Sequence, residues 1–114
     1  MNSNRYQVVL NFESLWGDNY YERTLKSNIV NFNNPIRAGE RISLSKGLKV
    51  VVEEVIHERG YSEVNVNLTW QCGANDVPPY GDNPLVYWDE KPDDQLKKQF
   101  DSIVRRYRKA LDNL

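Results

Sequence analysis

Two stretches of the chain alternate regularly between apolar and polar residues. They are Tyr6–Phe12 and Glu63–Trp70, and their alternating apolar residues are Tyr6, Val8, Leu10, Phe12, Val64, Val66, Leu68 and Trp70. A period of two is typical of a β-strand that buries one face. We therefore predict a strand in each stretch, within a sheet that has one buried and one wet face, as antiparallel sheets commonly do.

Shorter stretches with strand-forming residues lie between and after these two. Aromatic and β-branched residues gather between turn residues in Tyr20–Leu25, Ile29–Phe32, Arg41–Leu44 and Leu85–Trp88, and such residues favour strands. Pro84 directly precedes the last of these stretches, and a proline at the start of a strand indicates an edge strand.

In one stretch, Leu48–His57, the spacing of the apolar residues fits both a helix and a strand. Its apolar residues match either a helical stripe or the alternation of a strand. Four valines and an isoleucine favour the strand, because β-branched side chains lose rotamer freedom in a helix. The alternative is a helix over Leu48–Arg59, which would give a two-layer α/β sandwich. A turn at Glu58–Tyr61 would follow the strand.

The last part of the chain has the clearest helical period. Its apolar residues recur every three or four positions, at Leu96, Phe100, Ile103, Tyr107, Leu111 and Leu114. This spacing forms one apolar stripe, and we predict an amphipathic helix over residues 93–113. Pro92 suits a first helical turn.

Together these elements predict an α+β, mostly β fold. Five or six antiparallel strands would form a small sheet or a partly open SH3-like barrel, with the C-terminal amphipathic helix packed on it. Residues 1–114 would form a single domain, with residues 1–5 disordered.

A motif-level resemblance points the same way. The pattern resembles small β-barrel domains of short prokaryotic and phage proteins at Pro35, Gly39, Glu40, Ile42, Val52, Val55, Val64, Val66 and Leu68. The resemblance implies an SH3-like or related barrel and implies no particular activity.

Charge and composition exclude some classes of function. The chain has 15 basic and 16 acidic residues, a net charge of −1, so no overall field attracts a polyanion. Binding of nucleic acid would need the charges to be segregated on the surface. The first residues lack an apolar signal region, and no apolar run is long enough to span a membrane. With one cysteine and no possible internal disulfide, a cytoplasmic protein is expected.

Candidate catalytic groups are few. His57 is the one imidazole and Cys72 the one thiol, and a small enzyme using either residue is one hypothesis. Structural zinc needs four nitrogen or sulfur ligands. Acidic residues cluster late in the chain, at Asp76, Asp82, Asp89, Glu90, Asp93 and Asp94. Their spacing matches no calcium-binding loop. We expect neither a metal nor a cofactor.

Exposed aromatic residues are the stronger functional signal. The chain has more tyrosine and tryptophan than a core of this size must hold, and such residues dominate binding hot spots. The candidates are Trp16, Tyr61, Tyr80 and Trp88. The long loop 71–83 is either a site or only a connection. We therefore expect a non-enzymatic module that binds another protein through loop aromatics and a sheet edge, as in small prokaryotic or phage-type proteins.

The helix suggests two alternatives. Arg105, Arg106, Arg108 and Lys109 surround Tyr107, and basic residues beside an aromatic can bind nucleic acid. Tyr107 falls on the apolar stripe, however, so we expect it to be packed. An apolar stripe wider than the sheet can cover would instead support a homodimer.

Overall fold

The structure is a computed structural model that describes residues 4–16, 19–45, 48–72, 84–87 and 93–114. Within these ranges, the side chains of residues 14–16, 19–21, 69–72, 84–87, 93–96 and 99 lie outside the description. The elements are β1 (Arg5–Trp16), β2 (Asn19–Asn31), β3 (Arg41–Ser45), β4 (Leu48–Val51), β5 (Glu54–His57), β6 (Ser62–Cys72), β7 (Pro84–Tyr87) and α1 (Asp93–Asp112). The predicted class, mostly β with one C-terminal helix, is confirmed.

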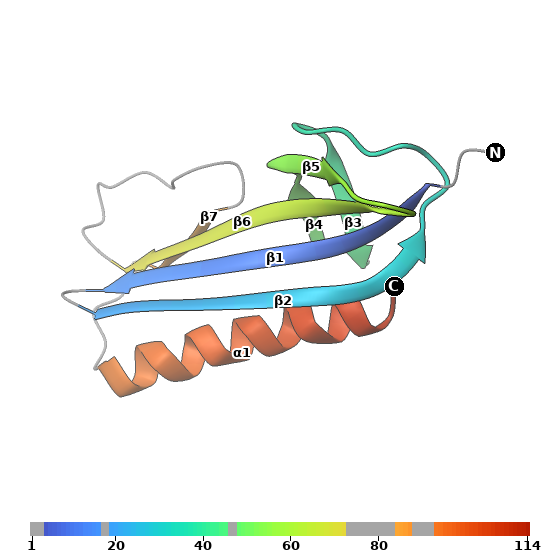
Figure 1. Ribbon diagram of the computed structural model, residues 1–114. Coiled ribbons are helices and arrows are strands. Elements are labelled where there is room, and N and C mark those ends of the chain that lie inside the picture. Colours follow the sequence, from blue (N-terminus) through green and yellow to red (C-terminus); the bar gives the residue numbers. More distant parts are fainter. Residues whose placement is uncertain (1–3, 17–18, 46–47, 73–83, 88–92) are drawn as a thin grey trace.

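The strands form an open mixed sheet and a separate hairpin instead of a barrel (Figure 1). The main sheet has the order β2-β1-β6-β5, and β7 also pairs with β6. β1 pairs antiparallel with β2 but parallel with β6, in a register that runs from Tyr6 opposite Ser62 to Leu15 opposite Gln71. The parallel pairs β1–β6 and β6–β7 depart from the antiparallel arrangement that alternation suggested.

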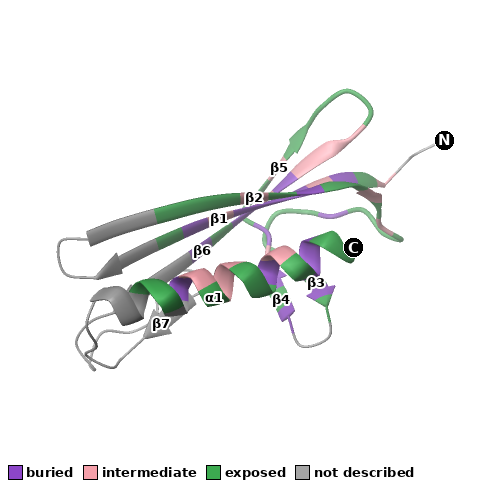
Figure 2. Cartoon of the chain, turned by 90° about the horizontal axis from the view of Figure 1, so that it is seen from below, coloured by how far each residue is buried: buried purple, intermediate pink, exposed green. Residues whose placement is uncertain are grey.

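A second layer covers one face of the main sheet. It contains α1 and, beside it, the β3–β4 hairpin (Figure 2). The core lies between the layers and includes Val8, Phe12, Val66 and Phe100, each at most 1% exposed. The alternating residues of β1 and β6 that faced the predicted core, up to Leu68, are all buried. Phe12 makes edge-to-face contacts with two aromatics of α1, with ring centroids 6.4 Å from Phe100 and 5.3 Å from Tyr107.

The stretch Leu48–His57 contains two strands, so it is neither the single predicted strand nor a helix. β4 pairs with β3 in the hairpin, whereas β5 pairs with β6 in the main sheet. Between them, the main chain of Val52 is held by Gly39 N–H and Glu40 C=O, each at 2.8 Å. These bonds replace strand pairing at the point where the chain leaves one sheet for the other.

The second strand is longer than its sequence pattern indicated. The predicted strand Tyr20–Leu25 and the stretch Ile29–Phe32, predicted as a short strand or an extended lead-in, belong to one strand, β2, except for Phe32. The strand ends at Asn31 and continues through a bulge at Ser27 and Asn28. The Ser27 hydroxyl is buried there, accepts from Val8 N–H at 2.9 Å and donates to Asn28 C=O at 2.7 Å. A side chain thus completes the ladder where the backbone register shifts. Near the start of the chain, Arg5, which was predicted to be disordered, is the first residue of β1.

Candidate binding surface

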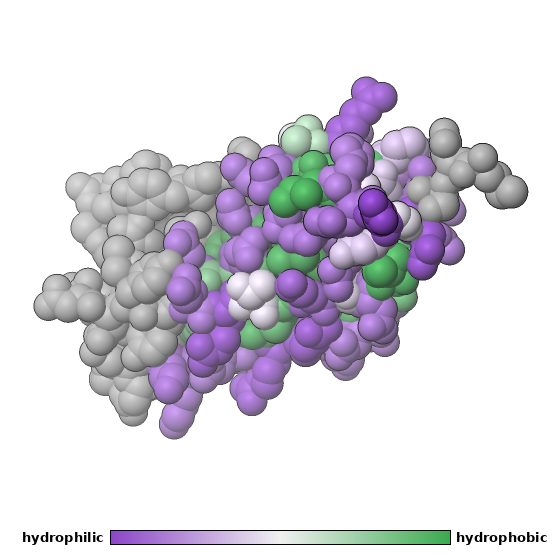
Figure 3. All heavy atoms as spheres, viewed as in Figure 1, coloured by the Kyte–Doolittle hydropathy of each residue, from purple (hydrophilic) through white to green (hydrophobic). Residues whose placement is uncertain are grey.

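We call the face of the main sheet turned away from α1 the outer face; its described part is mostly polar, although Ile29 and Ile56 on it are each 40% exposed. Figure 3 shows it as largely hydrophilic with small hydrophobic spots. At its centre, Asn11 lies between Thr24 on β2 and Asn67 on β6. Its amide donates to Asn67 Oδ1 at 3.4 Å, and the Thr24 hydroxyl donates to Asn11 Oδ1 at 3.4 Å. This network links side chains of β2, β1 and β6 across the outer face.

The long edge of β2 is the most extended main-chain surface in the described part of the molecule. β2 pairs with β1 on one side, and the described residues place no strand on the other. In an antiparallel ladder, successive residues direct their N–H and C=O groups alternately to the two sides. Arg108 of α1 reaches the C=O of Lys26 from outside the sheet. Lys26 therefore faces outward, as does Thr24 two residues earlier.

Two arginines cover carbonyls of this edge. Arg108 Nη2 donates to Lys26 C=O at 3.0 Å, and the same guanidinium forms an ion pair with Asp112 at 2.8 Å. Arg23 Nη1 donates to Glu22 C=O at 3.0 Å. Unpaired edges invite pairing with other chains, and natural proteins protect them with charged side chains and bulges. The β2 edge has both forms of protection.

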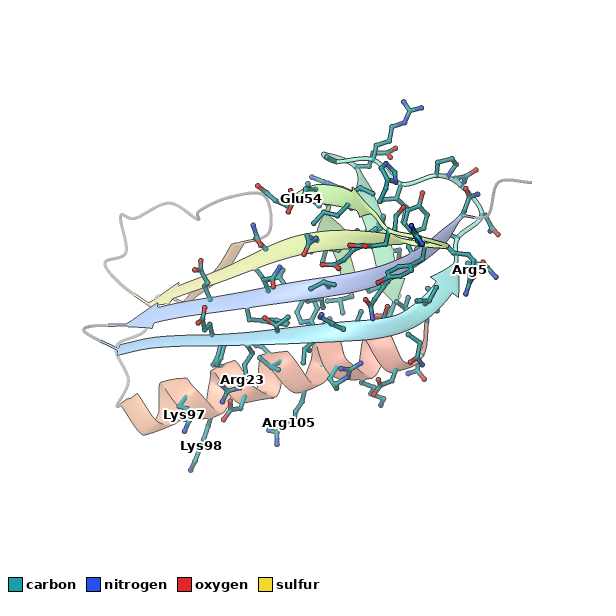
Figure 4. All side chains as sticks on the ribbon, viewed as in Figure 1. Arg5, Arg23, Glu54, Lys97, Lys98 and Arg105 are labelled. Atoms are coloured by element: carbon teal, nitrogen blue, oxygen red, sulfur yellow. The ribbon has the colours of Figure 1, made fainter. Side chains whose placement is uncertain are left out.

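Basic side chains border this edge on the side of α1. Lys97, Lys98 and Arg105 project from α1, and Arg23 reaches from β2 toward the helix (Figure 4). All four are exposed, and we call them the basic flank. Lys97, Arg105 and Arg108 are separated by eight and three residues, so they lie on one side of α1. Since Arg108 contacts β2, that side borders β2.

The outer face has the opposite charge. Strand alternation places four glutamates on it, namely Glu13, Glu22, Glu54 and Glu63, against two basic residues, Arg5 and Lys26. Along the described part of α1 there are six basic side chains, against the acidic Asp101 and Asp112. The near-zero net charge therefore conceals two surfaces of opposite sign. A chain of near-zero net charge needs such segregation of charge to form a charged binding surface.

Of the four aromatics predicted to bind a partner, only Tyr61 has a described side chain. Trp16 ends β1, but its side chain lies outside the description. Tyr61 is half-buried in the turn before β6, where its C=O accepts from Glu58 N–H at 2.9 Å. Tyr80, Trp88 and most of the loop 71–83 lie outside the described residues. A protein-binding role for these four aromatics therefore stays a prediction.

The predicted basic residues of α1 have different environments. Arg105, Arg106 and Lys109 are exposed, whereas Arg108 is half-buried and engaged with β2. Tyr107 is buried, as its position on the stripe predicted. This burial raises the pKa of the Tyr107 hydroxyl above its ordinary value, and the charge of the neighbouring Arg106 opposes the shift.

The two candidate catalytic residues are at opposite ends of β6, because His57 pairs with its first residue, Ser62, and Cys72 is its last. His57 is exposed at the end of β5, and its Nδ1 lies 2.8 Å from Ser62 Oγ on the paired strand. This contact joins the two ends of the β5–β6 hairpin. Cys72 ends β6, and its side chain lies outside the description. The enzyme hypothesis for His57 or Cys72 stays a prediction.

The remaining candidates give no metal site among the described residues. Asp76, Asp82, Asp89 and Glu90 lie outside the description, and Asp93 and Asp94 begin α1 with undescribed side chains. A hollow of about 390 Å³ lies between Phe32 and Ser43, with a mixed polar and apolar lining. In the described part of the chain, no helix has the length and apolar character needed to cross a lipid bilayer.

Comparisons with known proteins do not assign the chain to a family. No protein-family model, no curated protein sequence and no solved structure matches it.

Proposed function

We propose that the chain is a non-enzymatic module that binds another protein by adding an extended segment of that partner to the edge of β2. The supporting observation is the edge itself, because β2 spans 13 residues and pairs on one side only within the described structure. Strand addition gains affinity from main-chain hydrogen bonds and specificity from alternate side chains.

The edge arginines are compatible with this role. An unoccupied edge needs partners for its carbonyls, and Arg23 and Arg108 supply them. Both contacts are made by long side chains at the surface. A docking strand can therefore replace these contacts without disturbing the β1–β2 ladder. Before a partner strand binds, the charged arginine side chains disfavour pairing of this edge with other chains.

A proline substitution tests the proposal directly. Thr24 faces outward, so Thr24→Pro removes a donor from the edge but no N–H from the β1–β2 ladder, the setting in which strands tolerate proline. Thr24→Val is the matched control, since it removes the hydroxyl and keeps the N–H. Purified chain is used to select binders from a library of random dodecapeptides, and their affinity is measured by fluorescence anisotropy.

We expect the selected peptides to bind the native chain and the Thr24→Val variant equally. Thr24→Pro should weaken binding by about tenfold, the effect of losing roughly one main-chain hydrogen bond. Circular dichroism and urea unfolding confirm that each variant is folded. Peptides that bind the folded Thr24→Pro variant as tightly as the native chain would rule out strand addition at β2.

Nucleic-acid binding is the second candidate. It is supported by the exposed Lys98, Arg105, Arg106 and Lys109 on α1. Against it, both aromatics of α1 whose side chains are described, Phe100 and Tyr107, are buried, so neither offers a base a stacking surface. The test is the affinity for oligothymidylate between about 50 and 200 mM salt, which must fall steeply if phosphates are bound.

A further inference from the structure

We infer that the segment added to β2 is acidic, with its carboxylates on alternate residues facing α1. This inference rests on the proposed strand addition and identifies the class of partner. Its basis is the position of the basic flank, which borders the same edge that would receive the segment.

The dimensions of the two elements match. Lys97 and Arg108 are 11 residues apart on α1, which is about 16 Å at the rise of an α-helix. About five residues of an extended strand cover the same length. α1 runs alongside β2 (Figure 1). A strand paired with β2 would therefore direct every second side chain toward the basic flank over that distance.

The two faces of the sheet require different side chains in the partner. Arg23 lies opposite Phe12 in the β1–β2 register, so it is on the face covered by α1. On the outer face, Glu22 and the neighbouring Glu13 would repel carboxylates, and Lys26, which lies on the same face, offsets only one of these two charges. Acidic residues are therefore favoured toward α1, and neutral residues are favoured toward the outer face. Asp101 and Asp112 reduce the positive potential of α1 without reversing it.

A second copy of the chain fits this edge less well. Pairing β2 with β2 of another copy would bring two basic flanks to one seam, because each flank borders its own edge. Like charges brought together in this way oppose association. An acidic segment gains from the same charges. Charge complementarity thus selects the acidic segment over the homodimer.

The experiment uses the dodecapeptides selected above and two double variants of equal charge change. Lys98→Glu with Arg105→Glu reverses the basic flank. Arg41→Glu with Lys49→Glu changes two exposed basic residues on the β3–β4 hairpin and serves as the control. Neither pair touches the β1–β2 ladder. Circular dichroism and urea midpoints establish that both variants fold.

We expect acidic residues to be enriched at alternate positions of the selected peptides. Reversing the basic flank should weaken their binding tenfold or more, and the hairpin control should change it less than twofold. Added salt should reduce the difference between the two variants, since exposed charges are screened.

Other results separate this inference from the proposed function. Peptides that depend on the Thr24 N–H but show no acidic bias would overturn the inference and keep strand addition. Peptides unaffected by Thr24→Pro would overturn both. Oligothymidylate binding is the third outcome. If its affinity falls when the charge of the basic flank is reversed but is unchanged by Thr24→Pro, then the basic flank binds nucleic acid and the inference is wrong.

Discussion

Tyr107 shows how one side chain connects the core to the charged surface. Its ring packs against Phe12. Of its neighbours in sequence, Arg106 is exposed and Arg108 is half-buried. The phenol is therefore buried among apolar residues although the chain around it is strongly basic. The sequence indicated this packing, because Tyr107 occupies the apolar stripe of α1.

The raised pKa of Tyr107 predicts a loss of stability at high pH. In the unfolded chain, the phenol ionises near its ordinary value of about 10; in the native state its pKa is higher because of burial. Its contribution to stability is thus complete below that value and is lost as the pH rises through the native pKa. Urea midpoints measured from neutral pH to about pH 11 should fall less steeply for Tyr107→Phe than for the native chain. Identical pH profiles would contradict this reasoning.

The role of Arg108 could not be predicted in the same way. Its sequence position, one residue from Tyr107, indicated a solvent-exposed phosphate contact. In the structure its guanidinium instead bonds Lys26 C=O, 82 residues away. Periodicity shows which side of a helix is polar, but it does not show which element borders that side. The edge arginines are therefore the part of the candidate site that sequence patterns miss.

At the scale of the elements, β2 has two chemically different sides. Residues that face β1 donate their backbone N–H groups to hydrogen bonds of the β1–β2 ladder, and residues that face outward do not. Hydrogen exchange can measure this difference residue by residue. We expect the amide of Leu25 to be protected and that of Thr24 to exchange rapidly. Equal protection of both amides in the free chain would show that the outer edge of β2 is already paired.

The bulge in β2 depends on one hydroxyl. Ser27→Ala leaves the buried N–H of Val8 without its acceptor, and such a loss costs about 1–3 kcal/mol. Ser102→Ala on the exposed side of α1 is the control and should change stability little, because alanine favours helices. Urea unfolding of both variants measures the difference. If Ser27→Ala is as stable as the control, the hydroxyl does not support the bulge.

Elements were predicted best where the apolar residues fit only one period, either that of a strand or that of a helix. The alternation of Val64, Val66 and Leu68 and the stripe of α1 both correspond to observed elements. The division between β4 and β5 was missed because apolar residues continue across it. Only tertiary bonds, from Val52 to Gly39 and Glu40, mark the change of sheet. Such tertiary bonds cannot be predicted from the local sequence pattern.

At the scale of the whole molecule, the described residues of the apolar stripe of α1 are largely covered, with Ile103 and Leu114 half-buried. Phe100, Tyr107 and Leu111 are buried against the sheet, so little apolar area remains for a second helix. We predict a monomer whose sedimentation mass is independent of concentration over the micromolar range. A mass that rises with concentration would instead support the homodimer considered from the sequence.

The arrangement of strands was the least predictable property of the molecule. Alternation in β1 and β6 indicated one buried face in each, but it did not indicate that the two strands are parallel neighbours. The distribution of charge was equally hidden. A net charge of −1 is compatible with a uniform surface, and only the sheet register separates the glutamates of the outer face from the basic residues of α1.

The parallel pair β1–β6 also determines the order in which the chain can fold. Every contact in that ladder joins residues 56 positions apart. During synthesis, β1 and β2 can form a hairpin early, but the second edge of β1 stays open until β6 has left the ribosome. Folding dominated by such distant pairings is slow, and open edges favour aggregation in the interval. The slowest step for a newly made chain is therefore expected to be the arrival of β6 at β1.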